Sequence, residues 1–169
     1  MKEVVEKIKE VIDRTYFKKY FEWFIRKLEL VERSEKLDII RREKQEHPIQ
    51  PRKGDIYLIE FGQNIGKELS DKHMGIIVQG SSKNVVTSTV LVIPISSSKK
   101  LYDTHELIHI EDLKEGKLNK LPSKAKSEQL TCVDKARLIY KIGSLTDNFM
   151  GKLEKRILKN LDIKPKNIL

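Results

Sequence analysis

Glycine and proline are absent from the first 47 residues of this 169-residue chain, whereas all eight glycines and all five prolines lie from Pro48 onward. Both residues interrupt helices and mark turns, so the first part favours uninterrupted helix and the second a turn-rich structure. The segment His47-Pro48-Ile49-Gln50-Pro51 is typical of an extended linker, because a proline disfavours helix at the residue before it. We therefore divide the chain into a helical extension at 1–47, a linker at 48–52 and a second unit at 53–169.

An apolar stripe runs along the extension, with members mostly three or four residues apart, as on one face of a helix. Its members are Val4, Val5, Ile8, Val11, Ile12, Tyr16, Tyr20, Phe24, Leu28 and Val31. The spacing predicts either one long helix or a helical hairpin with a break near Arg33-Ser34. The stripe is typical of a packing surface, against the rest of the chain or a second subunit, and Trp23 is more typical of a core than of a ligand site.

Short segments rich in β-branched residues fill the second unit, separated by Gly, Ser, Asn or Lys clusters, which is a pattern typical of strands. They are Ile56–Phe61, Gly75–Gln79, Thr89–Ile95, His105–Ile110, Ser127–Val133 and Leu138–Ile142. An amphipathic helix is predicted from Asp147 to Leu161, with Thr146 or Asp147 as its N-cap. The predicted fold class is α+β, a small antiparallel barrel or sandwich with a C-terminal helix, preceded by the helical extension.

Hydrophobicity and cysteine content indicate the cellular compartment of the chain. No apolar run reaches the roughly 18 residues of a membrane-spanning helix, and the N-terminus lacks the apolar stretch of a signal peptide. The one cysteine, Cys132, cannot form an internal disulfide, which is typical of a reducing compartment. We therefore expect a cytoplasmic protein that does not enter a membrane.

The net charge of +9 suits a polyanionic partner, and it is unevenly distributed. Residues 1–50 carry 13 basic and 11 acidic side chains, which leaves +7 on residues 51–169. Five lysines are concentrated in one segment that can follow a phosphate backbone or form a solvated loop face. They are Lys114, Lys117, Lys120, Lys124 and Lys126.

The string His105-Glu106-Leu107-Ile108-His109 matches the H-E-x-x-H pattern of zinc peptidases. That chemistry requires a helix, because two histidines one turn apart bind the metal and the glutamate activates water. Here the β-branched surroundings favour a strand, and only a distant carboxylate such as Glu128 is left as a third ligand. We therefore expect no metal site at this string.

Further motifs follow one another in an order and spacing that resemble the MazF/PemK family of toxin endoribonucleases. The motifs are Gly54–Leu58, Gly66–Glu68, Gly75–Gln79, Asn84, Thr89–Ser96, Thr104-His105, Ser123, Glu128-Gln129, Val133–Lys135, Arg137-Leu138 and Ile142-Gly143. The similarity covers about residues 52–162 and leaves the helical extension outside. It implies an SH3-like barrel with a C-terminal helix, a homodimer, cleavage of single-stranded RNA such as mRNA without metal or cofactor, and inhibition by a cognate antitoxin.

The resemblance also implies a catalytic pair. The family has an Arg-Pro pair before the second strand and a Thr or Ser at the end of the third, and the matching positions here are His73-Met74 and Ser96. Metal-free cleavage must deprotonate the ribose 2′-OH, stabilise the phosphorane and protonate the departing 5′-oxygen. An imidazole loses the bidentate phosphate grip of a guanidinium but is well suited to proton transfer near neutral pH. We therefore expect His73 and Ser96 to be the catalytic residues.

Five further residues are expected to bind RNA on the same resemblance: Lys72, Gln79, Ser123, Lys126 and Glu128. Lys72 is placed to supply the charge lost at His73, while Lys126 and Glu128 are expected two apart on one strand, on the same face. Thr131 stands where the family commonly has Arg, which removes a second positive charge.

Two alternatives to a ribonuclease remain on the same barrel. One is a catalytically silent RNA-binding or protein-binding regulatory module, motivated by the two lost arginines. The other is a toxin that acts on DNA, like related gyrase poisons. The extension at 1–47 is expected either to widen the dimer or to occupy the groove of an antitoxin helix.

Overall fold

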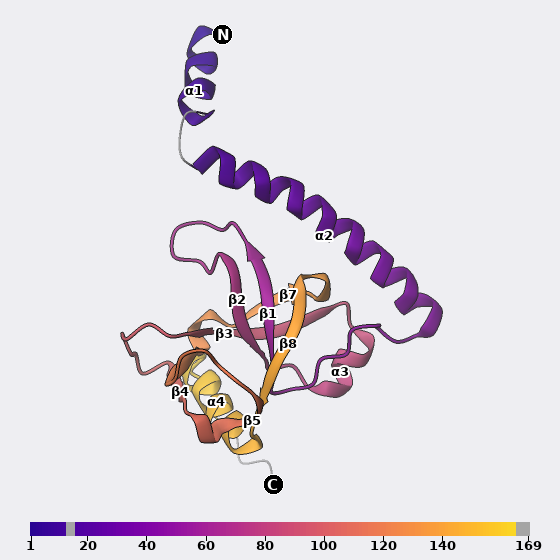
Figure 1. The fold of residues 1–169 in the computed structure, drawn as a ribbon, viewed down its shortest axis with the longest axis vertical. Coiled ribbons are helices and arrows are strands. Elements are labelled where there is room, and N and C mark those ends of the chain that lie inside the picture. The colour runs from indigo at the N-terminus through magenta and orange to yellow at the C-terminus, as the bar shows by residue number, and fades with distance from the viewer. Residues whose placement is uncertain (13–15, 165–169) are drawn as a thin grey trace.

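A computed structural model describes residues 1–12 and 16–164 and shows a curled antiparallel sheet with helices on both sides (Figure 1). The predicted α+β class is confirmed: a half-barrel sheet is followed by a C-terminal helix and preceded by a long N-terminal helix. No helix in the described ranges is long and apolar enough to cross a bilayer.

The extension forms two helices, α1 (Lys2–Ile12) and α2 (Tyr16–Lys44). Helix α2 runs unbroken through Arg33 and Ser34, so of the two alternatives the hairpin with a break at that point is excluded. The chain between the helices, residues 13–15, lies outside the described residues. Of the predicted stripe, the side chains of Ile8, Val11, Ile12 and Tyr16 also lie outside the description.

Helix α2 packs on the sheet through a different face from the predicted stripe. Phe24, Leu28 and Val31 are exposed, so of the two predicted partners of the stripe, the rest of the chain and a second subunit, the first is excluded for these residues. The contacts come instead from the opposite side of the helix. Arg26 Nε and Nη2 donate to the carboxylate of Glu60, with the shortest distance 2.9 Å, and Arg33 Nη1 donates to a backbone carbonyl at 2.8 Å.

Eight strands form the sheet, in the order β4-β6-β3-β2-β1-β8-β5, with β7 paired to β3. Their bounds are β1 Asp55–Gly62, β2 Asp71–Ile77, β3 Thr89–Ser96, β4 His105–Ile108, β5 Leu113–Gly116, β6 Ser123–Lys126, β7 Thr131–Asp134 and β8 Leu138–Leu145. Three 3₁₀ turns separate them: η1 Ile110–Asp112, η2 Ser127–Gln129 and η3 Lys135–Arg137.

Two predicted strands differ from those observed. The strand predicted at Gly75–Gln79 begins earlier, at Asp71, and ends at Ile77. The segment Ser127–Val133 is not one strand, because η2 occupies its first residues and β7 begins at Thr131.

Strands β5 and β6 are absent from the prediction, because their sequences, LKEG and SKAK, contain no β-branched residue. Pairing with other strands decides their conformation. A β-carbon at Gly143 would lie 2.3 Å from the carbonyl oxygen of Glu115, so β5 and β8 approach each other too closely for any larger residue there.

Alternation along the strands produces two apolar clusters, one on each face of the sheet. One cluster includes Ile56, Ile76 and Ile93 and is covered by α4 (Asp147–Asn160). Residues Phe149 and Leu153 of α4 are completely buried in it. The other cluster includes Ile59, Ile77, Val90, Val92 and Leu138. Helix α4 begins as predicted, because the Thr146 side chain accepts a hydrogen bond from the backbone N–H of Phe149 at 3.3 Å.

The predicted linker at 48–52 lies against the sheet unit. His47 is buried and its backbone N–H donates to the carbonyl of Val85 at 2.6 Å. Val85 belongs to α3 (Ser81–Val86), a short helix that the sequence did not predict. The buried Asn84 amide in the same helix donates to the carbonyl of Pro51 at 2.8 Å. Asn84, part of the family-like pattern, therefore has a structural role.

Candidate functional site

Strands β2 and β3 bring the two predicted catalytic residues together. Gly75 pairs with Pro94, and His73 and Ser96 each lie two residues further along their antiparallel strands. Side chains two residues apart share a face, so both lie on the same face at the same end of this strand pair. They line one open pocket of about 360 Å³. The structure therefore brings both residues to one pocket.

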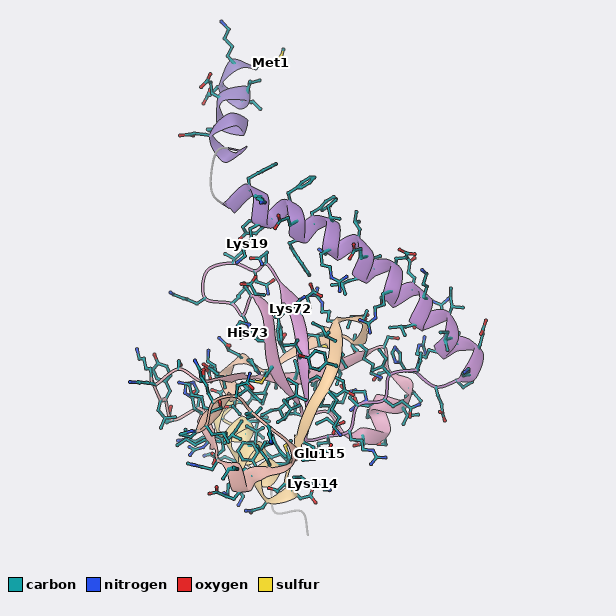
Figure 2. The ribbon with its side chains drawn as sticks, in the orientation of Figure 1. Met1, Lys19, Lys72, His73, Lys114 and Glu115 are labelled. Atoms are coloured by element: carbon teal, nitrogen blue, oxygen red, sulfur yellow. The ribbon has the colours of Figure 1, made fainter. Side chains whose placement is uncertain are left out.

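His73 sits on β2 opposite Ile59 of β1, and Figure 2 labels it beside Lys72. Its Nδ1 atom is buried and has no hydrogen-bond partner among the described residues. Buried polar atoms without a partner are rare in folded proteins and call for a structural or functional explanation. His73 also adds to the lowered pKa of the nearby Asp71 carboxyl, after the larger effects of hydrogen bonds from Gln63 and Lys19.

Ser96 is the last residue of β3 and is only partly buried. Its hydroxyl oxygen accepts a hydrogen bond from the backbone N–H of Ser98 at 3.3 Å and lies 3.2 Å from the Ser98 hydroxyl. These two contacts hold the hydroxyl beside Ser98 at the end of β3. Such an oriented hydroxyl can donate to an oxygen of a bound phosphate.

Other strands contribute to the same pocket. Lys72, a predicted RNA-binding residue, is exposed and lines it. Tyr140 of β8 and Asn119, from the loop between β5 and β6, also line it but were not predicted. The pairing of Tyr140 with Leu58 carries the tyrosine to this edge. The signal in the sequence is an aromatic residue inside the predicted strand Leu138–Ile142, but the sequence does not show that its ring is exposed.

One predicted RNA-binding residue, Glu128, lines a separate pocket, and Lys126 lies close to it. Glu128 lines a hollow of about 530 Å³ together with Lys67 and Thr131. The prediction that Lys126 and Glu128 share one strand is wrong, because β6 ends at Lys126 and Glu128 lies in η2. Their charged groups are 3.8 Å apart.

The Glu128 carboxylate is also held by its neighbours. It accepts hydrogen bonds from Thr104 and from the buried His105, both at 3.0 Å. Burial alone would raise the pKa of Glu128, but hydrogen bonds from its own backbone, from His105 and from Thr104 lower it overall. The carboxylate is therefore ionised and fixed in position at neutral pH.

Gln79 and Ser123 lie apart from the residues lining either pocket. The Gln79 amide donates to the Thr87 hydroxyl at 3.0 Å, beyond the end of β2 opposite to His73. Ser123 is buried, and its hydroxyl donates to the carbonyl of Lys120 at 2.7 Å. Both side chains are engaged in local hydrogen bonds.

The lysine-rich segment is not one continuous basic surface. Lys124 is buried and its ammonium group donates to the carbonyl oxygen of Lys100. Lys126 is partly neutralised by Glu128. Lys114, Lys117 and Lys120 are exposed.

The H-E-x-x-H string adopts the strand conformation that its composition favours. His105 to Ile108 form β4, which pairs with β6, so the helical spacing of a zinc peptidase is not present. Within residues 1–12 and 16–164, no group of three His, Cys, Asp or Glu side chains is arranged to hold a metal ion.

The fold matches the group of proteins that the sequence resembles. Residues 52–161 match the family described as PemK-like, MazF-like toxin of type II toxin-antitoxin systems. Because this match spans most of the chain, the protein belongs to the PemK/MazF toxin family. Helices α1 and α2 lie outside the matched residues.

Solved structures show the same fold at low sequence identity. An endoribonuclease from mycobacterial species has a TM-score of 0.56 at 16% identity, covering 70% of this chain and 96% of that chain. A mycobacterial endoribonuclease in complex with its cognate antitoxin also has a TM-score of 0.56 at 16% identity, with coverages of 69% and 99%. MazF from Deinococcus radiodurans has a TM-score of 0.56 at 14% identity, with coverages of 68% and 99%. No curated protein is significantly similar to this chain.

Proposed function

We propose that this chain is the toxin of a type II toxin–antitoxin pair and a metal-independent endoribonuclease that cleaves single-stranded RNA. The observation that carries the proposal is that His73 and Ser96, from two different strands, line one open pocket. Membership of the PemK/MazF family supports the reaction class.

In the proposed reaction, the imidazole of His73 removes the proton of a ribose 2′-OH, and the resulting oxygen attacks the adjacent phosphorus. The P–O bond to the 5′-oxygen then breaks, this oxygen takes a proton from water and leaves as a 5′-hydroxyl, and the His73 imidazolium returns its proton to the solvent. The products are a 2′,3′-cyclic phosphate and a 5′-hydroxyl end. The Ser96 hydroxyl donates to a non-bridging phosphate oxygen, where negative charge increases in the transition state.

Lys72 supports this assignment because it is the lysine among the residues lining the pocket, at a position next to the lost family arginine. An ammonium group beside the phosphate stabilises the same negative charge, although without the planar, bidentate geometry of a guanidinium. Tyr140 has a phenolic hydroxyl and an aromatic face at the same pocket, and stacking on aromatic rings is a common way to hold an unpaired base.

The partners proposed for this chain are single-stranded RNA such as mRNA, a cognate antitoxin in the cytoplasm and a second copy in a homodimer. A mycobacterial endoribonuclease solved with its antitoxin supports the antitoxin. The surplus positive charge of residues 51–169 suits both RNA and an acidic inhibitory segment.

The test is cleavage of single-stranded RNA by the purified protein in EDTA, with analysis of the fragment ends. We expect 2′,3′-cyclic phosphate ends, and a loss of at least about a hundredfold in cleavage rate for His73→Ala, the usual scale for removing a general base. His109→Ala is the matched control, because His109 is exposed and does not line the pocket. Equal rates for the two variants would reject the role of His73.

A second candidate is a catalytically silent RNA-binding or protein-binding module. It is favoured by the charge pattern, because Lys124 is buried and Lys126 is paired, while Thr131 occupies a family arginine position. Induced expression separates the two functions. An active ribonuclease arrests growth, and His73→Ala relieves the arrest, whereas a silent module leaves growth unchanged in both cases.

A further inference from the structure

Helix α2 has two faces with different surroundings. Trp23, Arg26, Leu30 and Arg33 face the sheet, and Leu30 is buried. The opposite face carries five large apolar side chains, Phe17, Phe21, Phe24, Leu28 and Val31. We call these five residues the α2 seam.

The seam is regularly spaced and open to solvent. Its members follow one another at alternating intervals of four, three, four and three residues, which is the spacing of the core positions of a coiled coil. Their exposed fractions range from 40% at Phe17 to 55% at Phe21 and Phe24. Tyr20 and Ile25 flank the seam and are each 45% exposed. Figure 2 shows side chains on the side of α2 away from the sheet projecting into open space.

Contiguous exposed apolar surface of this size is uncommon on a protein that works alone. Half-exposed side chains of this kind leave roughly 600 Å² of mostly apolar surface on one copy, counting the seam and its two flanking residues. Pairing two such surfaces would bury roughly 1,200 Å² in total, which reaches the lower limit of stable protein interfaces. The seam together with its two flanking residues is therefore large enough to hold two chains together.

We propose that the α2 seam binds the α2 seam of a second copy of this chain, side by side and parallel, as a short two-stranded coiled coil. The core layers then consist of like residues, with Phe24 against Phe24 and Leu28 against Leu28. The sheet units lie on the outer sides of the pair, because Arg26 and Arg33 direct each sheet to the opposite face of its helix.

The charges beside the seam fit this arrangement. In a parallel coiled coil, the residue directly before a core position such as Leu28 lies next to the residue five positions later on the other helix. This rule brings Lys27 next to Glu32 of the second copy, and the reverse pair forms on the other side. Lys27 has no ion-pair partner within the described ranges, and the exposed Glu32 is bound only by Lys36 of its own helix, at 2.6 Å. An antiparallel pair would instead place the two Lys27 side chains near each other, which is repulsive.

This interface differs from any association of the family barrel, because the seam lies outside residues 52–161. The inference does not depend on ribonuclease activity. A protein that cleaves no RNA would still assemble through α2, so the two proposals fail independently.

The first test measures the mass of the full-length protein in solution over a series of concentrations, by light scattering or sedimentation. We expect Phe24→Lys together with Leu28→Lys to raise the dissociation constant of one pairing step by at least roughly a hundredfold, halving the assembled mass. Ile39→Lys is the matched control, since Ile39 is 55% exposed on the same helix but lies beyond the seam. Unchanged mass in the double variant, or an equal loss in the control, overturns the proposal.

The second test fixes the orientation by cysteine cross-linking in the full-length protein, with Cys132 replaced by Ser. Oxidation of the Phe24→Cys variant should produce a covalent dimer, because like residues meet in a parallel pair. Ile39→Cys should not cross-link. A cross-link that forms only when Phe24→Cys and Leu28→Cys proteins are mixed would show an antiparallel pair and overturn the parallel arrangement.

Discussion

The sheet unit and α2 both contain many large apolar residues, but they bury them differently. Ile56, Ile76 and Ile93 of the sheet are completely buried, because the strands and α4 cover one another within the chain. On α2, Phe21 and Phe24 lie at the surface of the same chain. The comparison shows that hydrophobic periodicity identifies an apolar face but does not identify its partner, which can lie outside the chain.

The largest expected effect comes from truncating one phenylalanine in each region. Phe149→Ala removes a completely buried ring from the cluster under α4 and should lower the free energy of unfolding by about 3–5 kcal/mol. Phe24→Ala should change it by less than about 0.5 kcal/mol in the separated chain, because the ring is already more than half exposed. Urea unfolding at low protein concentration measures both. Equal losses would mean that Phe24 is covered within the chain.

A buried lysine should make the stability of the folded chain depend on pH. Lys135 is completely buried, and its ammonium group donates to the carbonyl of Asn84 at 2.5 Å. Burial, only partly offset by the nearby Asp134, lowers the pKa of Lys135 from 10.5 to about 8. Between these values the unfolded chain binds more protons than the folded one, so the free energy of unfolding rises as pH increases. The full gain is on the order of 3 kcal/mol.

The measurement is urea unfolding across that pH range for the wild type and Lys135→Met. The variant should lose most of the rise in stability, because it has no group to deprotonate at this position. Lys83→Met is the control, since Lys83 is exposed on the neighbouring α3 and should keep the rise. If Lys135→Met kept the full pH dependence, another group would be responsible for it.

The sequence predicted elements whose own residues favour them. The β-branched runs of β1, β3 and β8 and the capped, amphipathic α4 were identified close to their observed bounds. Strands β5 and β6 were missed because their conformation depends on pairing with β8, β3 and β4 rather than on local composition. The unbroken course of α2 through Arg33 was also undecided, since those residues gain their contacts from the sheet.

The candidate site also depends partly on local sequence and partly on strand pairing. His73 and Ser96 were selected by resemblance, and the strand register brings them to one pocket. Tyr140 was missed because its position depends on how β8 pairs with β1 at the edge of the sheet. Gln79 also matches the family pattern but points to a different place, because β2 ends at Ile77 before reaching it. A motif therefore identifies candidate residues, while strand pairing decides which of them meet.

The smallest effect concerns the junction between the two regions, where Gly62 of β1 lies under Trp23 of α2. A β-carbon at Gly62 would lie 2.1 Å from the Trp23 ring, and the residue has a φ of +88°, so Gly62→Ala must displace the indole. Arg137, which lies 5.5 Å above the same ring, would lose this contact. We expect a red shift of the emission of Trp23, the one tryptophan in the chain, and a loss of about 1–2 kcal/mol from backbone strain.

A second glycine separates backbone strain from displacement of the helix. Gly66 also has a positive φ, of +62°, but a β-carbon there would contact nothing within 4 Å. Gly66→Ala should therefore carry a similar backbone cost while leaving the emission of Trp23 unchanged. If the Trp23 emission shifted in both variants, the cause would be a change in the loop between β1 and β2. If it shifted in neither variant, α2 would not hold Trp23 against β1. The expected difference between the two glycines thus tests whether the extension is anchored to the sheet through its inner face, which leaves the outer face free for a second chain.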